Sequence, residues 1–153
     1  MITPEKNKTN VELAVDLGSI MQELRNLTRK YIQKKIKEQD IDLTFEMLEV
    51  MGCLWKKDGL NQQEIADRTF RDKSSMTYLL DNLIKRKLVK RSADENDRRN
   101  KLIFLTKEGV SLKEILYSWL ADVYGLASGD ASSEDLQNGI LLIRKMVNNL
   151  KNE

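Results

Sequence analysis

The amino-acid sequence predicts a mainly α-helical protein that carries one small β-hairpin. Over long stretches, apolar residues recur in alternating steps of three and four, which is the spacing of one face of an α-helix. Two short runs, residues 88–92 and 101–105, flank a polar, charged loop and predict the hairpin. One Pro and seven Gly among 153 residues leave few points at which helices must break.

The first half of the chain is expected to hold a tail and three helices. Residues 1–10 are polar and should form a flexible N-terminal tail. The next helix carries a heptad seam, formed by Leu13, Leu17, Ile20, Leu24, Leu27 and Tyr31. Thr44 opens a second helix, which ends before the turn at Asp58–Gly59. Asn61 caps a short third helix, and Glu64 completes its capping box.

The second half is expected to hold a fourth helix, the hairpin and two more helices. Asp72 is the predicted N-cap of the fourth helix, whose buried face is formed by Met76, Leu79, Leu80 and Leu83. After the hairpin, Thr106 opens a fifth helix, and Ser132 or Ser133 caps a sixth. Both repeat the heptad spacing, first in Leu112, Leu116, Trp119, Val123 and Leu126, then in Leu136, Ile140, Ile143, Val147 and Leu150.

The composition argues against several classes of protein. The single Cys cannot form an internal disulfide framework and is typical of a reducing compartment. The absence of His removes the commonest general base and the commonest zinc ligand, so we expect no metal site and no cofactor. The sequence shows no phosphate-binding glycine loop and no nucleophile paired with a base, so we expect no enzyme. Without a secretory signal or a long apolar run, we expect a cytoplasmic protein that does not cross a membrane.

The basic residues are concentrated in one part of the chain. Residues 68–101 hold eleven basic side chains against five acidic ones, a net charge of +6, whereas the rest holds 15 against 19, a net charge of −4. We call residues 68–101 the basic band. Such a band on an acidic body favours a surface that binds a polyanion, although it would also fit an ordinary solvated face.

The order of the elements predicts two functional regions. Residues 41–106 should form a compact lobe in which a helix-turn-helix is followed by a charged hairpin, the wing. Residues 11–40 and 107–153 should form a helical region whose apolar seams are too long for this lobe to cover. A homodimer with interlocked terminal helices would bury them, and a monomeric bundle that closes on itself is the alternative.

Three stretches of the sequence resemble the MarR (multiple antibiotic resistance regulator) family of winged helix-turn-helix transcription factors. They are LNQQEIA (Leu60–Ala66), DKSSMTYLLDNLIKRKLVKR (Asp72–Arg91) and DRRNKLIFLTKEG (Asp97–Gly109). The expected helix order is similar over residues 12–150. The resemblance implies a homodimeric regulator that binds double-stranded DNA through a recognition helix and a wing.

The fourth helix is the expected recognition helix, because an α-helix fits the major groove and presents side chains to base edges. Its candidate contact residues are Lys73, Ser74, Ser75, Thr77, Tyr78 and Asn82. Tyr78 and Asn82 stand where the family often has Arg. Lys87 stands where a Gly usually ends this helix, so it must adopt a left-handed conformation or end the helix in another way.

The wing supplies the second set of candidate residues: Arg91, Asp97, Arg98, Arg99 and Lys101. A guanidinium at a hairpin tip can enter a narrow minor groove, where the negative potential is strongest, and we assign this role to Arg99. Asp97 is expected to orient the Arg99 guanidinium through a bidentate bond. The other three cations should contact phosphates.

Aromatic side chains indicate a candidate effector pocket. Tyr31, Trp55 and Tyr117 could line a site for a small aromatic or phenolic molecule, since the family binds aromatic acids between its helical region and its DNA lobe. Core packing is the alternative for each of them, and we expect it for Trp119. Cys53 is expected to be structural, because thiol-sensing relatives carry their cysteine near the start of the first helix.

These observations together predict a homodimeric, sequence-specific DNA-binding regulator, with repression as the expected outcome. Its two recognition helices should bind half-sites of a pseudo-palindrome, and an effector would release the DNA. A winged-helix protein–protein adaptor without DNA binding is one alternative, but it would not need the basic wing. A ligand-binding or enzymatic protein with a vestigial DNA lobe is another.

Overall fold

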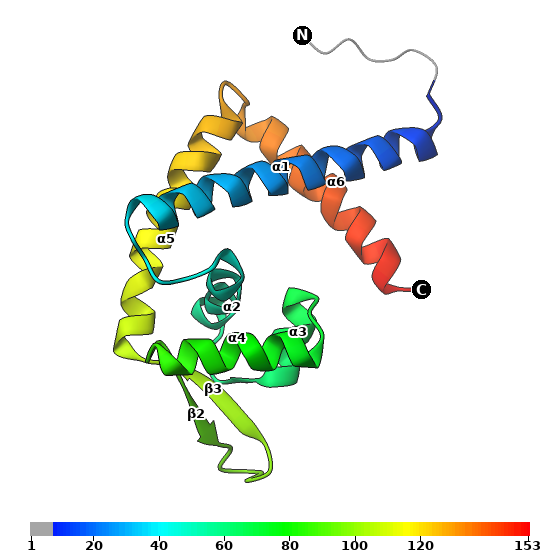
Figure 1. Ribbon diagram of the computed structural model, residues 1–153. Helices are drawn as coiled ribbons and strands as arrows, with labels where there is room; N and C mark the ends of the chain where they lie inside the picture. Colours follow the sequence, from blue (N-terminus) through cyan, green and yellow to red (C-terminus); the bar gives the residue numbers. More distant parts are fainter. Residues whose placement is uncertain (1–7) are drawn as a thin grey trace. The chain divides into compact units, whose positions relative to one another are not determined.

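The computed structural model describes residues 8–153 and confirms a mainly helical chain with a small antiparallel sheet. The chain divides into two compact units, one running to Leu120 and the other formed by Ala121–Glu153. The elements follow in the order α1 (Asn10–Glu38), α2 (Phe45–Lys56), β1 (Leu60–Asn61), α3 (Gln62–Thr69), α4 (Lys73–Lys85), β2 (Val89–Ala93), β3 (Lys101–Leu105), α5 (Lys107–Ser128) and α6 (Ser133–Lys151) (Figure 1).

The first unit is built around a continuous apolar core. The face of α4 that the sequence assigns to the core is buried, as are five side chains of α2: Met47, Leu48, Val50, Met51 and Leu54. Ile32 of α1 and Leu116 and Trp119 of α5 join the same cluster. The predicted core role of Trp119 is therefore confirmed, and the lobe draws part of its core from both flanking helices.

The sheet has three strands in the order β1-β3-β2, all antiparallel. The predicted hairpin is confirmed, with Val89 opposite Leu105 and Ala93 opposite Lys101. Strand β1 was not predicted. It has two residues, with Leu60 opposite Ile103, and a run this short carries no alternation that could reveal it.

Side-chain caps begin the helices where the sequence places them. Thr44, Asn61, Asp72 and Ser132 each accept a hydrogen bond from the backbone at the N-terminus of α2, α3, α4 and α6. The capping box of Asn61 and Glu64 is complete. Thr9 caps α1, which begins at Asn10, so the predicted tail of residues 1–10 is wrong for these two residues, and its residues 1–7 lie outside the described part.

The connection from α4 to β2 contains one unusual backbone position, and a glycine of α5 packs closely against it. Lys87 adopts φ 57°, so a non-glycine residue occupies the left-handed conformation at the end of this helix. Gly109, in the first turn of α5, lies against the backbone of Leu88: a Cβ at this position would be 2.1 Å from the Leu88 carbonyl oxygen. No side chain larger than hydrogen fits there without a shift of the backbone.

Two helices expose apolar seams. Along the N-terminal part of α1 the exposed apolar side chains are Val11, Leu13, Val15, Ile20, Met21, Leu24 and Leu27. In the second unit, α6 has no buried residue and exposes Leu136, Ile140, Leu141, Leu142, Val147 and Leu150. Among residues 8–153, no helix is long and apolar enough to span a bilayer.

Candidate nucleic-acid interface

The turn between α3 and α4 is short and closed by hydrogen bonds. Phe70 adopts a left-handed backbone conformation with φ 53°, and the N–H of Arg71 donates to the carbonyl of Ala66 at 3.0 Å. Asp72 then caps α4, accepting from the N–H of Ser75 at 2.8 Å and from its hydroxyl at 2.7 Å. These two bonds hold the pKa of the Asp72 carboxyl below its usual value. Helices α3 and α4 therefore form the predicted helix-turn-helix.

The six candidate residues of α4 fall into two groups. Three are exposed and make no side-chain hydrogen bond within residues 8–153: Lys73, Ser74 and Tyr78. The other three are already engaged: Ser75, Thr77 and Asn82. The Asn82 side chain donates to the carbonyl of Tyr78 at 2.9 Å and accepts from Arg86 at 3.1 Å. Lys73, Ser74 and Tyr78 are thus the candidate side chains of α4 that remain available to an external partner.

Sequence reasoning missed Gln62, the first residue of α3. Its side-chain amide donates to the Thr77 hydroxyl at 2.6 Å and lies 3.4 Å from the carbonyl oxygen of Lys73. Gln62 therefore braces the first turns of α4 against the start of α3. A polar amide directly after the helix cap at Asn61 is a weak signal that could have drawn attention to it.

The wing tip is ordered by its own acidic residues. Asp97 accepts a hydrogen bond from the backbone N–H of Arg99 at 3.0 Å, and Asp94 accepts from the N–H of Asn96 and the side chain of Asn100. Within residues 8–153 the Asp97 carboxylate forms no bond to the Arg99 guanidinium, so the expected bidentate bond is not present. Asp97 instead fixes the tip through the backbone, because a two-residue separation brings the Arg99 N–H closer than its guanidinium.

Arg91 has an internal partner that the sequence did not predict. Its guanidinium forms an ion pair with Asp81 of α4 at 2.9 Å, which ties strand β2 to the recognition helix. Arg98, Arg99 and Lys101 are exposed and form no ion pair among residues 8–153. These three cations of the wing are available to an external anion in this structure.

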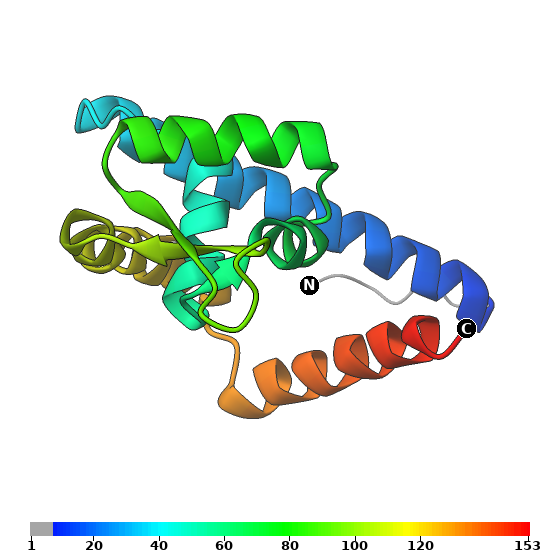
Figure 2. The same cartoon turned by 90° about the horizontal axis from the view of Figure 1, so that it is seen from below.

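The wing and the recognition helix meet across a shallow hollow. It is lined by Asn61, Gln62, Gln63, Lys73, Thr77, Arg99, Asn100 and Lys101. Figure 2 shows α3, α4 and the hairpin loop on the same face of the lobe, the face that is lowest in Figure 1. Side chains from two parts of the basic band, far apart in sequence, are therefore gathered on one surface.

Comparisons with known proteins agree with this geometry. The sequence model of the MarR family matches residues 43–101. The regulator TtmR of Methylorubrum extorquens is 39% identical over 72 residues, 47% of this chain and 37% of the relative. SarZ of Staphylococcus aureus, also named an HTH-type transcriptional regulator, is 35% identical over 78 residues, 51% of this chain and 53% of the relative. These matches span about a third to a half of each relative.

A solved structure extends the likeness over most of the chain. S. aureus MepR, crystallised in a DNA-binding conformation, superposes with a TM-score of 0.76 at 26% identity, covering 88% of this chain and 98% of MepR. Residues 43–101 of the chain form a MarR-family domain. Proteins of this family are transcription regulators rather than enzymes, and the part of this chain that the family model matches is its winged-helix lobe.

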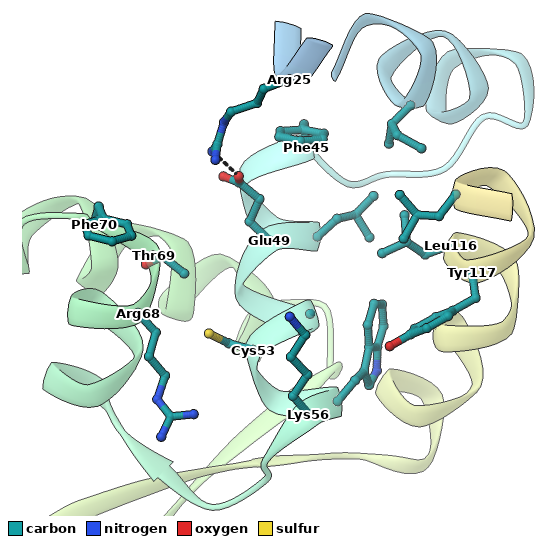
Figure 3. A pocket seen from close by; sticks show the side chains of 15 residues that line it. Arg25, Phe45, Glu49, Cys53, Lys56, Arg68, Thr69, Phe70, Leu116 and Tyr117 are labelled. Carbon is teal, nitrogen blue, oxygen red and sulfur yellow. Dashed lines mark hydrogen bonds and ion pairs between the residues drawn. The ribbon is translucent and has the colours of Figure 1, made fainter. Parts of the chain in front are cut away.

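The chain also contains a cavity of about 350 Å³, lined by other residues than the hollow. Two of the three expected aromatic residues, Trp55 and Tyr117, line it, together with Phe45 and Leu116 (Figure 3). The third, Tyr31, does not. It packs against the core, with Lys35 over its ring at 5.5 Å.

Charged groups line part of the cavity wall. Three basic side chains border it, Arg25, Lys56 and Arg68, against one carboxylate, Glu49. Figure 3 shows Glu49 paired with Arg25 at one edge of the cavity. A cavity with aromatic walls and an excess of positive charge is chemically suited to an anionic aromatic molecule.

Cys53 also lines the cavity and is partly buried. Burial raises the pKa of its thiol, and Arg68 and Lys56 oppose that shift only in part. A raised pKa leaves less thiolate at neutral pH, which fits the expected structural role.

Proposed function

We propose that this chain is a homodimeric, sequence-specific DNA-binding repressor whose affinity for DNA is lowered by a small aromatic or phenolic effector. In this proposal residues 41–106 form the DNA-binding lobe, and residues 11–40 and 107–153 form the dimerisation region. Its two recognition helices occupy major-groove half-sites about 10–10.5 bp apart, centre to centre.

One observation carries the DNA-binding part. Lys73 of α4 lines the same hollow as the wing cations Arg99 and Lys101, and α4 and the hairpin loop lie on one face of the lobe (Figure 2). In the proposed complex Ser74 and Tyr78 read base edges, Lys73, Arg98 and Lys101 contact phosphates, and Arg99 enters the minor groove. Arg91 contributes once its bond to Asp81 is exchanged for a phosphate. Ser75, Thr77 and Asn82 support the helix that presents them.

Exposed apolar seams support the homodimer. The α1 seam and the α6 seam each leave several large apolar side chains in solvent. Stable monomeric proteins rarely expose large apolar patches of this kind. A second copy of the chain would cover both seams through a two-fold interface. The substitution Ile140→Glu should therefore shift the protein from dimer to monomer in analytical ultracentrifugation, whereas Lys37→Glu, on an exposed polar face of α1, should not.

The cavity supports the effector part of the proposal. Its aromatic lining and its three basic side chains favour a small aromatic acid, which could be tested with benzoate and salicylate as probes. Binding by calorimetry and a loss of DNA affinity at the same probe concentrations are the expected result. Binding with no change in DNA affinity would refute the release mechanism.

Selection from a random duplex pool tests the DNA-binding proposal directly. The expected winner is a sequence with two-fold symmetry, bound at least about a thousandfold more tightly than random DNA. Measurement at two salt concentrations separates phosphate contacts from base reading, because only the former depend steeply on salt. Weak binding without an enriched sequence would reject the repressor and favour a protein–protein adaptor.

A further inference from the structure

One carboxylate joins three separate elements of the first unit. Glu49, on α2, accepts from Arg25 of α1 at 2.6 Å through Oε1 and from Arg71 of the α3–α4 turn through Oε2. Figure 3 shows the Arg25 half of this arrangement. Because each oxygen serves a different guanidinium, Glu49 connects α1 to the residue that precedes the cap of the recognition helix.

Arg71 is placed where a small shift would be transmitted to α4. It is the only residue between the left-handed Phe70 and the cap Asp72, and its backbone N–H is bonded to Ala66. Only 21% of its side chain is exposed. Its buried Nε has no hydrogen-bond partner among the described residues. Within them, Glu49 is the acceptor for this guanidinium.

Loss of the Glu49 charge would leave a partly buried guanidinium without its acceptor. Such a group moves toward water or toward another acceptor rather than stay unpaired. Because Arg71 is bonded covalently to Asp72, this movement would change the position of the first turn of α4. That turn carries the exposed Lys73 and Ser74.

We propose that Glu49 is a positioning residue for DNA recognition, which fixes the start of the recognition helix through Arg71 while Arg25 holds its other oxygen. This inference rests on the proposed function, because it concerns how the same surface selects a sequence. Glu49 contacts no DNA itself in this proposal.

Glu46 offers a matched control. It lies one helical turn earlier on α2 and forms an ion pair with Arg29 of α1, so it also joins these two helices. It has no recorded bond to the α3–α4 turn. Glu46→Gln and Glu49→Gln therefore remove the same charge and the same kind of interhelical pair, but only the second releases Arg71.

The experiment compares affinity for the selected operator with affinity for random DNA. Glu49→Gln should lower this ratio about tenfold, within the range expected for residues coupled in one network, whereas Glu46→Gln should leave it within about twofold of the original protein. A purely structural role would lower the thermal midpoint of both variants and leave both ratios alike. Equal ratios for the two variants would overturn the proposal.

A double-mutant cycle tests whether Glu49 acts through Arg71. If it does, the double variant Glu49→Gln/Arg71→Gln should show the same ratio as Arg71→Gln alone. If the decreases of this ratio in the two single variants multiply in the double variant, Glu49 acts independently of Arg71 and the proposal is wrong. Should Glu49→Gln fail to fold, Glu49→Asp replaces it, since it keeps the charge but has too short a reach to hold both arginines.

Failure of the proposed function can be told apart from failure of this inference. If the original protein selects no sequence, the repressor proposal fails. The positioning of α4 is then read from amide hydrogen exchange over residues 73–79. Faster exchange there in Glu49→Gln than in Glu46→Gln supports the inference, and equal exchange overturns it.

Discussion

The indole N–H of Trp55 donates a hydrogen bond to the carbonyl oxygen of Gly109 at 2.8 Å. This bond joins α2 to the first turn of α5 at the point where Gly109 also lies against the backbone of Leu88. Thr106 completes the junction, because its hydroxyl accepts from the Gly109 N–H at 3.1 Å. The end of the wing, the core helix α2 and the start of α5 are therefore fixed together by two side-chain-to-backbone hydrogen bonds and one close backbone contact.

Gly109→Ala should destabilise the protein strongly. Its Cβ would overlap the Leu88 carbonyl, and overpacking of this kind costs about 1–3 kcal/mol or more. Gly125→Ala is the control on the same helix, since a Cβ there meets nothing within 4 Å and should be neutral or stabilise by up to about 1 kcal/mol. Urea denaturation measures both, and equal midpoints would contradict the close packing at Gly109.

Lys87→Gly should stabilise the fold. A left-handed conformation costs a non-glycine residue about 1–2 kcal/mol, and part of that cost is recovered when Gly replaces Lys at φ 57°. Lys85→Gly, two residues earlier and within α4, should instead lower the free energy of unfolding by up to about 1 kcal/mol. Opposite shifts of the thermal midpoint are expected, and a fall for both variants would contradict the interpretation.

The Asp72 cap predicts an acid-sensitive contribution to stability. Because its pKa is lower when folded than when unfolded, its charge stabilises the fold above the ordinary carboxyl pKa. That contribution should fall as the pH drops below about 4 and through the lowered pKa. Asp72→Asn keeps a capping acceptor without the charge. Its free energy of unfolding should be lower than that of the original protein at pH 7, and the difference should shrink at pH 3. A difference that is the same at both pH values would mean that the charge has no role.

Arg99→Ala should weaken operator binding without affecting folding. Removing a guanidinium that contacts DNA is expected to cost about 1–3 kcal/mol of binding free energy, while the exposed wing tip contributes little to the core. Lys37→Ala removes an exposed cation outside the basic band and should change neither property. Mobility-shift titrations measure the affinity for the operator, and thermal unfolding measures the stability of the fold. Unchanged DNA affinity in Arg99→Ala would refute the wing assignment.

Cys53 should react slowly with alkylating reagents at neutral pH. Burial raises the pKa of its thiol, so the thiolate fraction is smaller than in the unfolded chain. Alkylation by iodoacetamide at pH 7 should be slower than in urea, and its rate should still be rising at about pH 9. A rate that levels off below pH 8 would indicate a reactive cysteine instead.

The sequence was sufficient for most of the fold because the relevant signals are local. Caps such as Asn61 and Asp72 and the apolar periodicity of α4 define helix starts and buried faces within a few residues. Lys87 was correctly identified as a position that would need a special conformation, although the choice between a left-handed residue and another ending required the structure.

The candidate site was less predictable because its contacts join residues far apart in the chain. The bond from Gln62 to Thr77 and the pair of Arg91 with Asp81 depend on how α3, α4 and the wing are packed. The Asp97 side chain was assigned to the wrong donor of Arg99, since charge alone does not distinguish a guanidinium from a backbone N–H. The role of Glu49 has no local signal at all.

The two tryptophans lie in very different surroundings, and this has a practical consequence. Trp119 is 4% exposed in the core, whereas Trp55 is partly exposed in the wall of the cavity. Intrinsic emission from Trp55 should therefore respond to a molecule entering the cavity, while that of Trp119 provides a steady background. The chain contains its own optical reporter, so small molecules can be screened for binding to the cavity on the unlabelled protein.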